Sequence, residues 1–301
     1  MIATALTRLF ELEHPIVLAP MGVVSGGRLA AAVSNAGGLG LVGGGYGDRA
    51  WLNRELDLVS QLTSRPWGVG LITWSCDRSI VDLVLAQRPH AVMLSFGDPR
   101  PHAAVIKAAG YRLICQVQDL AGARLAREAG ADLIVAQGTE AGGHTGQMAG
   151  FAFVPAVREF FDGILILAGA IGDGRAIRAA EILGAELSYM GTRFIAAEES
   201  IAFQPYKQMV VESRFEDLLL SSSFTGAHAY YLKPSIINAG LDPANLPVKG
   251  KMDLTGSDTK VKAWKDVWSA GQGVGTIRSV EPVATIVDRL EQEYREACAL
   301  P

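Results

Sequence analysis

The chain is poor in cysteine and has no block of like charge. Its three cysteines, Cys76, Cys115 and Cys298, are an odd number without metal-type spacing. This pattern favours the reducing cytosol over a disulfide framework, and it predicts no metal site. The net charge is −4, and the basic residues form no cluster. The charge pattern therefore argues against nucleic acid or an anionic membrane surface as a partner.

Long apolar runs are also missing. No run approaches the ~18 residues that a membrane-spanning helix needs. Residues 1–15 contain acidic side chains and lack the continuous apolar core of a signal peptide. We therefore expect a cytoplasmic globular protein that acts on a small molecule and binds neither membrane nor nucleic acid. The oligomeric state stays open, a homo-oligomer included.

Glycine, by contrast, is abundant, with 34 among 301 residues against a typical share of ~7%. Eight short, nearly continuous apolar runs recur along the first two thirds of the chain. Continuous apolar runs indicate strands buried on both faces, as in a parallel sheet covered by helices. The runs are Ile16–Ala19, Leu39–Val42, Trp67–Ile72, Ala91–Ser95, Arg112–Gln116, Asp132–Ala136, Ile164–Ala168 and Leu187–Met190.

Amphipathic segments with readable ends lie between several of these runs. Asp119 is placed to cap one helix that ends at Gly130, and Asp173 to cap another that ends at Gly184. Eight such strand–helix units predict an α/β fold, the (β/α)8 TIM barrel. An open, doubly wound sheet is the alternative, but it seldom uses eight consecutive parallel strands.

The strand rhythm stops after Arg193. Residues 200–277 are richer in Tyr, Pro, Lys and Ser and show no strand period. We predict that they form a smaller, mostly helical lid domain inserted into a barrel made of residues 1–199 and 278–301. The last segment has an apolar stripe that includes Val283, Ile286 and Leu290, with Ser279 as its expected cap. It is a candidate for the eighth barrel helix.

Active sites of such barrels lie at the carboxyl ends of the strands, and the last two loops commonly bind phosphate. Gly169, Ala170 and Gly172 follow the seventh run, and Gly191 and Thr192 follow the eighth. Their backbone N–H groups and the helix start near residue 174 suit an anion. The alternative is that these glycines only form tight turns.

His144 lies in the loop after the sixth run, among several glycines. It would be the reactive side chain of an otherwise bare loop, and imidazole suits proton transfer or charge stabilisation near neutral pH. The alternative is a structural histidine in a turn. Metal binding is disfavoured because no second His or Cys stands at ligand spacing. For Glu140 in the same loop, a ligand contact, a helix cap and a solvated side chain all remain open.

These motifs together resemble the nitronate monooxygenase family, formerly called 2-nitropropane dioxygenases. The string E-A-G-G-H, followed about fifty residues later by M-G-T-R-F, is the most specific part. FMN-dependent enoyl-acyl carrier protein reductases and flavin-dependent quinone reductases share it. The resemblance rests on Ala19-Pro20-Met21, Ala36-Gly37-Gly38-Leu39-Gly40, the run Gln137–Gly146, Met190-Gly191-Thr192-Arg193-Phe194 and Ser269-Ala270-Gly271-Gln272.

The resemblance implies a noncovalently bound FMN. Its phosphate would lie on the loops after the last two strands, its ring over Pro20 and Met21, and His144 would face the substrate. The residues implied to contact FMN are Ala19, Pro20, Met21, Gln116, Ala141, Gly142, Gly143, Gly169, Ala170, Gly172, Gly191, Thr192 and Gln272.

Two positions depart from the family pattern. Gly70 stands where the family often has Asn, so one flavin hydrogen bond is expected to be missing or supplied otherwise. Ala170 replaces a glycine, and because alanine does not easily take a positive φ, we expect that turn to differ slightly.

The implied activity is oxidation of alkyl nitronates or nitroalkanes by O2 to a carbonyl compound and nitrite. His144 would be a general base for a neutral nitroalkane, or an imidazolium that stabilises the charge of a nitronate. The second hypothesis is an NAD(P)H-dependent flavin reductase of enoyl thioesters or quinones. A third is a non-catalytic flavin-binding or phosphate-binding module with an idle histidine.

Overall fold

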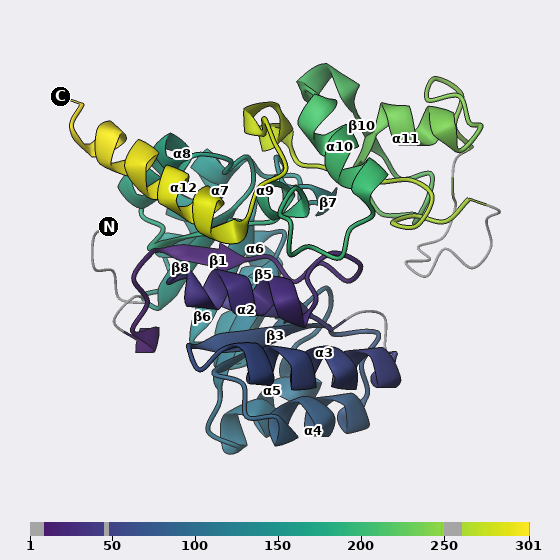
Figure 1. Cartoon of the computed structure of the whole chain (residues 1–301). Helices are drawn as coiled ribbons and strands as arrows, with labels where there is room; N and C mark the ends of the chain where they lie inside the picture. Colours follow the sequence, from purple (N-terminus) through teal and green to yellow (C-terminus); the bar gives the residue numbers. More distant parts are fainter. Residues whose placement is uncertain (1–8, 45–47, 248, 250–260, 301) are drawn as a thin grey trace.

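The computed structural model describes residues 9–44, 48–247, 249 and 261–300. Its centre is an eight-stranded parallel sheet in the order β1-β9-β8-β6-β5-β4-β3-β2. A parallel bridge between Val17 in β1 and Leu39, directly before β2, closes the barrel. Figure 1 shows helices on the outer side of these strands. The strands are β1 (Ile16–Leu18), β2 (Gly40–Gly43), β3 (Trp67–Ile72), β4 (Ala91–Ser95), β5 (Arg112–Val117), β6 (Leu133–Gln137), β8 (Ile164–Ala168) and β9 (Leu187–Met190).

The helices between the strands surround this barrel, and the predicted (β/α)8 fold is confirmed. One apolar cluster fills the barrel interior and includes Leu41, Met93 and Ile166. A second cluster lies between the strands and the helices. The helices are α2 (Gly27–Asn35), α3 (Arg49–Leu62), α4 (Arg78–Ala86), α5 (Arg100–Ala108), α6 (Leu120–Glu128), α7 (Gly150–Arg158), α8 (Gly174–Leu183) and α12 (Val283–Cys298).

Aspartates cap several of these helices, as the sequence predicts. The Asp119 carboxylate accepts from the Gly122 N–H at 2.7 Å, and Asp173 accepts from the Ala176 N–H at 2.8 Å. Gly184 ends α8 in the left-handed conformation, with φ of 108°. Such caps satisfy backbone groups at helix ends that have no partner inside the helix.

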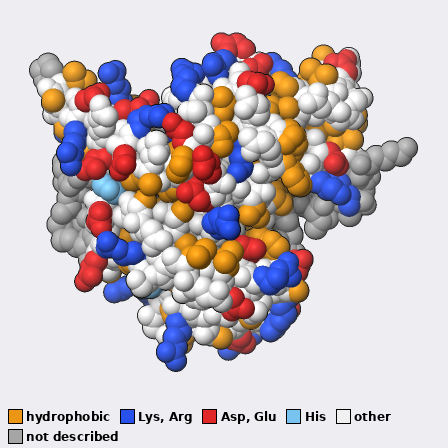
Figure 2. All heavy atoms as spheres, in the orientation of Figure 1, with side chains coloured by type: hydrophobic (Ala, Val, Ile, Leu, Met, Phe, Trp, Pro, Cys, Tyr) orange, Lys and Arg blue, Asp and Glu red, His pale blue; other side chains and the backbone are white. Residues whose placement is uncertain are grey.

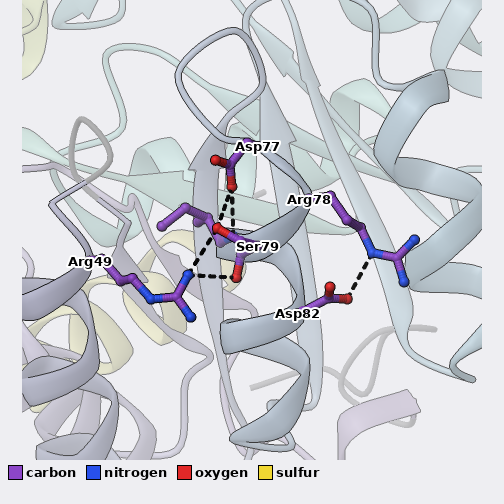
Figure 3. A network of polar contacts seen from close by, with 6 residues as sticks. Arg49, Asp77, Arg78, Ser79 and Asp82 are labelled. Atoms are coloured by element: carbon purple, nitrogen blue, oxygen red, sulfur yellow. Dashed lines mark hydrogen bonds and ion pairs between the residues drawn. The ribbon is translucent and has the colours of Figure 1, made fainter.

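At α4 the cap belongs to a larger exposed network (Figure 3). Asp77 accepts from the Ile80 N–H at 3.0 Å and from the Ser79 hydroxyl at 2.7 Å. Arg49, the first residue of α3, donates to the Ser79 hydroxyl at 2.9 Å, and Arg78 pairs with Asp82 on α4 itself. The network therefore joins the starts of two neighbouring barrel helices.

The last helix, α12, packs against α8 and α2 and completes the barrel as its eighth helix. The predicted cap at Ser279 is wrong, because α12 begins at Val283. The carboxylate of Glu199 accepts from the Val283 N–H at 3.0 Å instead. Barrel residues from either side of the inserted segment thus meet at the start of this helix.

The inserted segment contains strands as well as helices, although its sequence has no strand period. Strands β10 and β11 form an antiparallel hairpin, and β11 also pairs with β7 of the barrel loop that carries His144. Because this sheet is built from short segments that are distant in the chain, the sequence shows no local strand pattern for it. Together with β7 (Gly143–His144) and α9 (Thr192–Ile195) of the barrel part, the described elements here are α10 (Gln204–Glu212), η1 (Phe215–Asp217), β10 (Leu218–Ser221), β11 (Ala229–Leu232), α11 (Lys233–Asn238) and η2 (Gln272–Thr276).

The face of the molecule in Figure 2 carries Lys and Arg intermixed with Asp and Glu, without a wide area of one sign. In the described part of the chain, no helix combines the length and the apolar character needed to cross a bilayer. All three cysteines are free thiols.

Candidate active site

A large cavity opens at the carboxyl ends of the barrel strands, under the inserted segment. It encloses about 1270 Å³ between atoms, open solvent at its mouth included. Of the predicted site residues, those that line it are Ala19, Pro20, Met21, Gln116, Ala141, Gly142, Gly143, His144, Gly169, Ala170, Gly172, Gly191 and Thr192.

The loops after β8 and β9 line the cavity and carry several backbone N–H groups that are free to bind a ligand. In the described residues, the N–H groups of Ala170, Gly172, Gly191 and Thr192 have no acceptor. Gly169 has φ of 129°, and Ala170 has φ of 52°. The expectation that Ala170 would avoid a positive φ is therefore wrong, and the turn keeps the shape that glycine would give it. Such concave N–H groups are typical of anion sites.

The inserted segment closes one side of these loops. The Thr192 hydroxyl accepts from the Gly271 N–H at 2.8 Å. A Cβ at Gly172 would lie 2.2 Å from Oγ1 of Thr276, so a larger residue there would displace the Thr276 side chain. The residues that follow β9 are thus held in place by the segment 271–276 of the lid.

The contact of Gly70 with Pro20 explains why a glycine stands at position 70. A Cβ on Gly70 would lie 2.1 Å from Cγ of Pro20, which no real side chain tolerates. Because the Pro20 ring occupies this space, an Asn cannot stand at position 70 without displacing Pro20. The departure from the family pattern is therefore coupled to the placement of Pro20 at the cavity wall.

Four polar side chains form a buried network under the cavity. The Tyr189 hydroxyl donates to Oε1 of Gln116 at 2.9 Å. Oε1 of Gln137 accepts from Nε2 of Gln116 at 2.9 Å and from Nε2 of Gln118 at 2.8 Å. Sequence reasoning identified Gln116 but missed Gln137 and Tyr189, which also line the cavity. The signal for Gln137 was its place at the carboxyl end of β6.

His144 lies at the end of β7 and faces the cavity. Its Nε2 is 2.9 Å from Oγ1 of Thr225 in the lid. The rings of Phe96 and Trp264 meet the imidazole edge-on, with centroid distances of 5.6 and 5.2 Å. Burial lowers the pKa of His144 to about 4 because a charged imidazolium loses its hydration there. Near neutral pH the imidazole is therefore uncharged, which disfavours the role of a standing positive charge.

Two other residues of the motifs have partners in the protein. The Gln272 side chain donates to the Tyr230 hydroxyl at 2.7 Å and does not line the cavity. Its flavin contact stays a prediction. The Glu140 carboxylate accepts from the Gly150 N–H at 3.2 Å, at the start of α7. Of the roles left open for Glu140, the structure thus provides the helix cap.

The residues that line the cavity fit a ligand with polar groups. Oγ of Ser269 and Nη1 of Arg193 are buried and have no hydrogen-bond partner among the described residues, and both residues line the cavity. Buried polar atoms normally have partners, so these two atoms point to a ligand with acceptor groups. No group of three or more His, Cys, Asp or Glu in the described residues is arranged to hold a metal ion.

Comparison with known proteins shows that this barrel is a flavin-dependent oxidoreductase. The family model for nitronate monooxygenase matches residues 3–79 and 72–293. The chain therefore belongs to the nitronate monooxygenase family, as its motifs predict.

Individual relatives have different names. A relative from Rhodococcus jostii, a (3aS,4S,5R,7aS)-5-hydroxy-7a-methyl-1-oxo-octahydro-1H-indene-4-carboxyl-CoA dehydrogenase, is 30% identical over 88% of this chain and 75% of its own length. The solved structure of FabK from Thermotoga maritima has a TM-score of 0.84 and 29% identity, covering 99% of this chain and 98% of FabK. Nitroalkane oxidase from Streptomyces ansochromogenes has a TM-score of 0.80 and 28% identity, covering 98% and 99%. The comparisons thus agree on the family, whereas the relatives are named for different substrates.

Proposed function

We propose that the protein oxidises alkyl nitronates and nitroalkanes with O2 to a carbonyl compound and nitrite, using FMN. The observation that carries the proposal is the position of His144. Its uncharged imidazole borders the same cavity as the free backbone N–H groups of the loops after β8 and β9. The N–H groups suit an anionic phosphate, and the His144 imidazole can accept a proton. The resemblance to nitroalkane oxidase supports the same chemistry.

FMN would be held by several parts of the cavity. The N–H groups of Ala170, Gly172, Gly191 and Thr192 would bind its phosphate, and Pro20 with Met21 would support its ring. Gln116 would reach it from β5, and Ala141 to Gly143 would lie along it without bulky side chains. When bound, FMN would supply the redox chemistry that links oxidation of the substrate to reduction of O2.

The protein's own task is then to bind the substrate and remove one proton. A neutral nitroalkane loses its α-proton to the His144 imidazole, which acts as a general base. Phe96 and Trp264 shield this position from water and give the substrate pocket an apolar edge. A nitronate supplied as the anion needs no such base, so His144 matters more for the neutral substrate.

An assay of nitrite release and O2 uptake tests the proposal. The FMN-loaded protein should form nitrite from 2-nitropropane and from propionate-3-nitronate without NAD(P)H. His144→Ala should keep the visible absorbance of bound flavin and lose turnover of the neutral nitroalkane by ~10²-fold or more. Unchanged turnover by this variant would rule out catalysis by His144.

The second candidate is NAD(P)H-dependent reduction of an enoyl thioester or a quinone. The Rhodococcus relative favours it, because that protein is named for a CoA thioester. Oxidation of NAD(P)H with an enoyl thioester or quinone, without nitrite from any nitro compound, would select this candidate. A protein that binds no flavin would contradict both.

A further inference from the structure

The hydrogen bond between His144 and Thr225 joins a barrel loop to the lid. Thr225 is completely buried and lies in the turn before β11. The turn is fixed on both sides, since the Gly226 N–H donates to the Ser222 carbonyl at 2.7 Å and the Thr145 N–H donates to the His228 carbonyl at 3.1 Å. β7 and β11 pair with His144 opposite Ala229. The Thr225 hydroxyl therefore has a defined position relative to the imidazole.

The Thr225 hydroxyl has one hydrogen and, besides the Tyr231 hydroxyl next to it, two acceptors within hydrogen-bond distance. Its oxygen lies 3.2 Å from the Ala227 carbonyl, which can only accept, and 2.9 Å from Nε2 of His144. If Thr225 donates to Ala227, its oxygen remains free to accept from a protonated Nε2. Both contacts are then hydrogen bonds. If Thr225 donates to Nε2 instead, the Ala227 carbonyl loses its donor. Because buried polar groups normally have hydrogen-bond partners, the arrangement in which Thr225 donates to Ala227 and accepts from Nε2 is favoured.

We propose that Thr225 is a positioning residue that holds His144 as the Nε2–H tautomer, with unprotonated Nδ1 as the proton acceptor in the cavity. Within the described residues Nδ1 has no hydrogen-bond partner. The bond made by one ring nitrogen decides the state of the other. The assignment deepens the proposed function and rests on it only for the substrate.

The proton transfer that follows is simple. The α C–H bond of the nitroalkane breaks, an N–H bond forms at Nδ1, and the electron pair stays on the substrate as the nitronate. The Nε2–H bond to Thr225 persists throughout, and the Thr225 hydroxyl continues to donate to Ala227. The catalytic ring can thus gain a proton without rotating.

The neighbours of this pair include one titratable group. The Tyr231 hydroxyl on β11 lies beside Thr225, and burial raises the pKa of Tyr231 to about 12. It stays protonated at neutral pH and adds no charge. Phe96 and Trp264, which meet the ring from other elements, are uncharged.

Nitrogen-15 NMR of the ring nitrogens of the FMN-loaded protein tests the tautomer directly. The chain has five histidines, and loss of one signal pair in His144→Gln assigns His144. At pH 7 we expect Nε2 at the shift of a protonated nitrogen and Nδ1 at that of an acceptor. The reverse assignment, or an imidazolium, would overturn the proposal whatever the variants do.

Thr225→Val removes the hydroxyl at nearly constant shape, and Thr225→Ser keeps it. Val should abolish the tautomer preference and lower kcat for 2-nitropropane by ~10-fold or more, a part of the ~10²–10⁴-fold that acid–base catalysis supplies. KM should change much less, and Ser should restore both readouts. Ser235→Ala, which removes another buried lid hydroxyl, should leave the tautomer intact.

The outcomes separate the two proposals. A Val variant with the wild-type tautomer and kcat contradicts the role of Thr225. The expected tautomer in a protein that forms no nitrite supports the assignment and contradicts the proposed substrate instead.

Discussion

At the scale of single residues, the imidazole of His144 links folding to pH. Its pKa is lowered to about 4 in the folded protein by burial, against ~6.5 in the unfolded chain. Because the unfolded chain binds the proton more readily, this residue adds stability above pH ~6.5. The added stability is lost as the pH falls from ~6.5 toward ~4, by about 3 kcal/mol in all.

Urea denaturation at pH 7 and pH 4 measures this contribution. The wild type should lose about 3 kcal/mol more than His144→Gln between these pH values. His102→Gln, on α5, is the control for a histidine outside the cavity. Equal losses in the wild type and in His144→Gln would show that the imidazole is not held uncharged.

Single residues also show where sequence reasoning reaches its limit. The glycines and His144 could be placed at the site because they follow apolar strands. The φ of Ala170 could not be predicted, because alanine takes φ of 52° only when surrounding contacts fix it. The network of Gln116, Gln137 and Tyr189 joins three strands, and its partners depend on the register of the closed barrel.

At the scale of elements, Glu140 connects the loop of His144 to α7. Its carboxylate accepts from the N–H of Gly150, the first residue of that helix. A negative charge at a helix start is favourable, and loss of a cap costs ~1 kcal/mol. We therefore expect Glu140→Ala to lower the free energy of unfolding by about 1 kcal/mol, and Glu140→Gln by less.

Urea denaturation measures this loss, and Glu128→Ala is its control, because Glu128 is the last residue of α6 and caps no helix start. The Glu140 loop also positions His144, so Glu140→Ala should slow turnover while FMN stays bound. An unchanged stability would mean that the helix start needs no such acceptor.

At the scale of the whole molecule, regular apolar runs predicted the barrel, because each unit repeats a local pattern. The three-stranded sheet of the lid could not be predicted in this way. β7 has two residues, and its partner β11 lies far away in the sequence. Its pairing depends on the folded barrel bringing both segments together, and that information is not local. The loop of His144 thus belongs to the barrel by sequence and to the lid sheet by hydrogen bonding.

The places where the chain leaves the barrel for the inserted segment and where it returns lie side by side. Ala197 and Glu281 form a parallel bridge, and the Glu281 carboxylate pairs with Arg193 at 2.7 Å and also with Arg289. The Arg193 side chain is only 5% exposed. Removing one partner of a buried pair leaves an uncompensated charge, at a cost of ~3–5 kcal/mol. Glu281→Ala should therefore lower the free energy of unfolding by about 3 kcal/mol, and Glu281→Gln by less, because an amide oxygen still accepts from Arg193.

Asp82→Ala provides the matched control for this pair. It removes the exposed partner of Arg78 on α4 (Figure 3), and exposed pairs contribute at most ~1 kcal/mol. Because Arg193 also lines the cavity, Glu281→Ala should weaken FMN binding in a fluorescence titration, whereas Asp82→Ala should not. If both variants lost the same stability and kept the same FMN affinity, the junction between lid and barrel would not depend on this ion pair. The lid would then be held mainly by the β7–β11 pairing and by the contacts of residues 271–276 with the loops after β8 and β9.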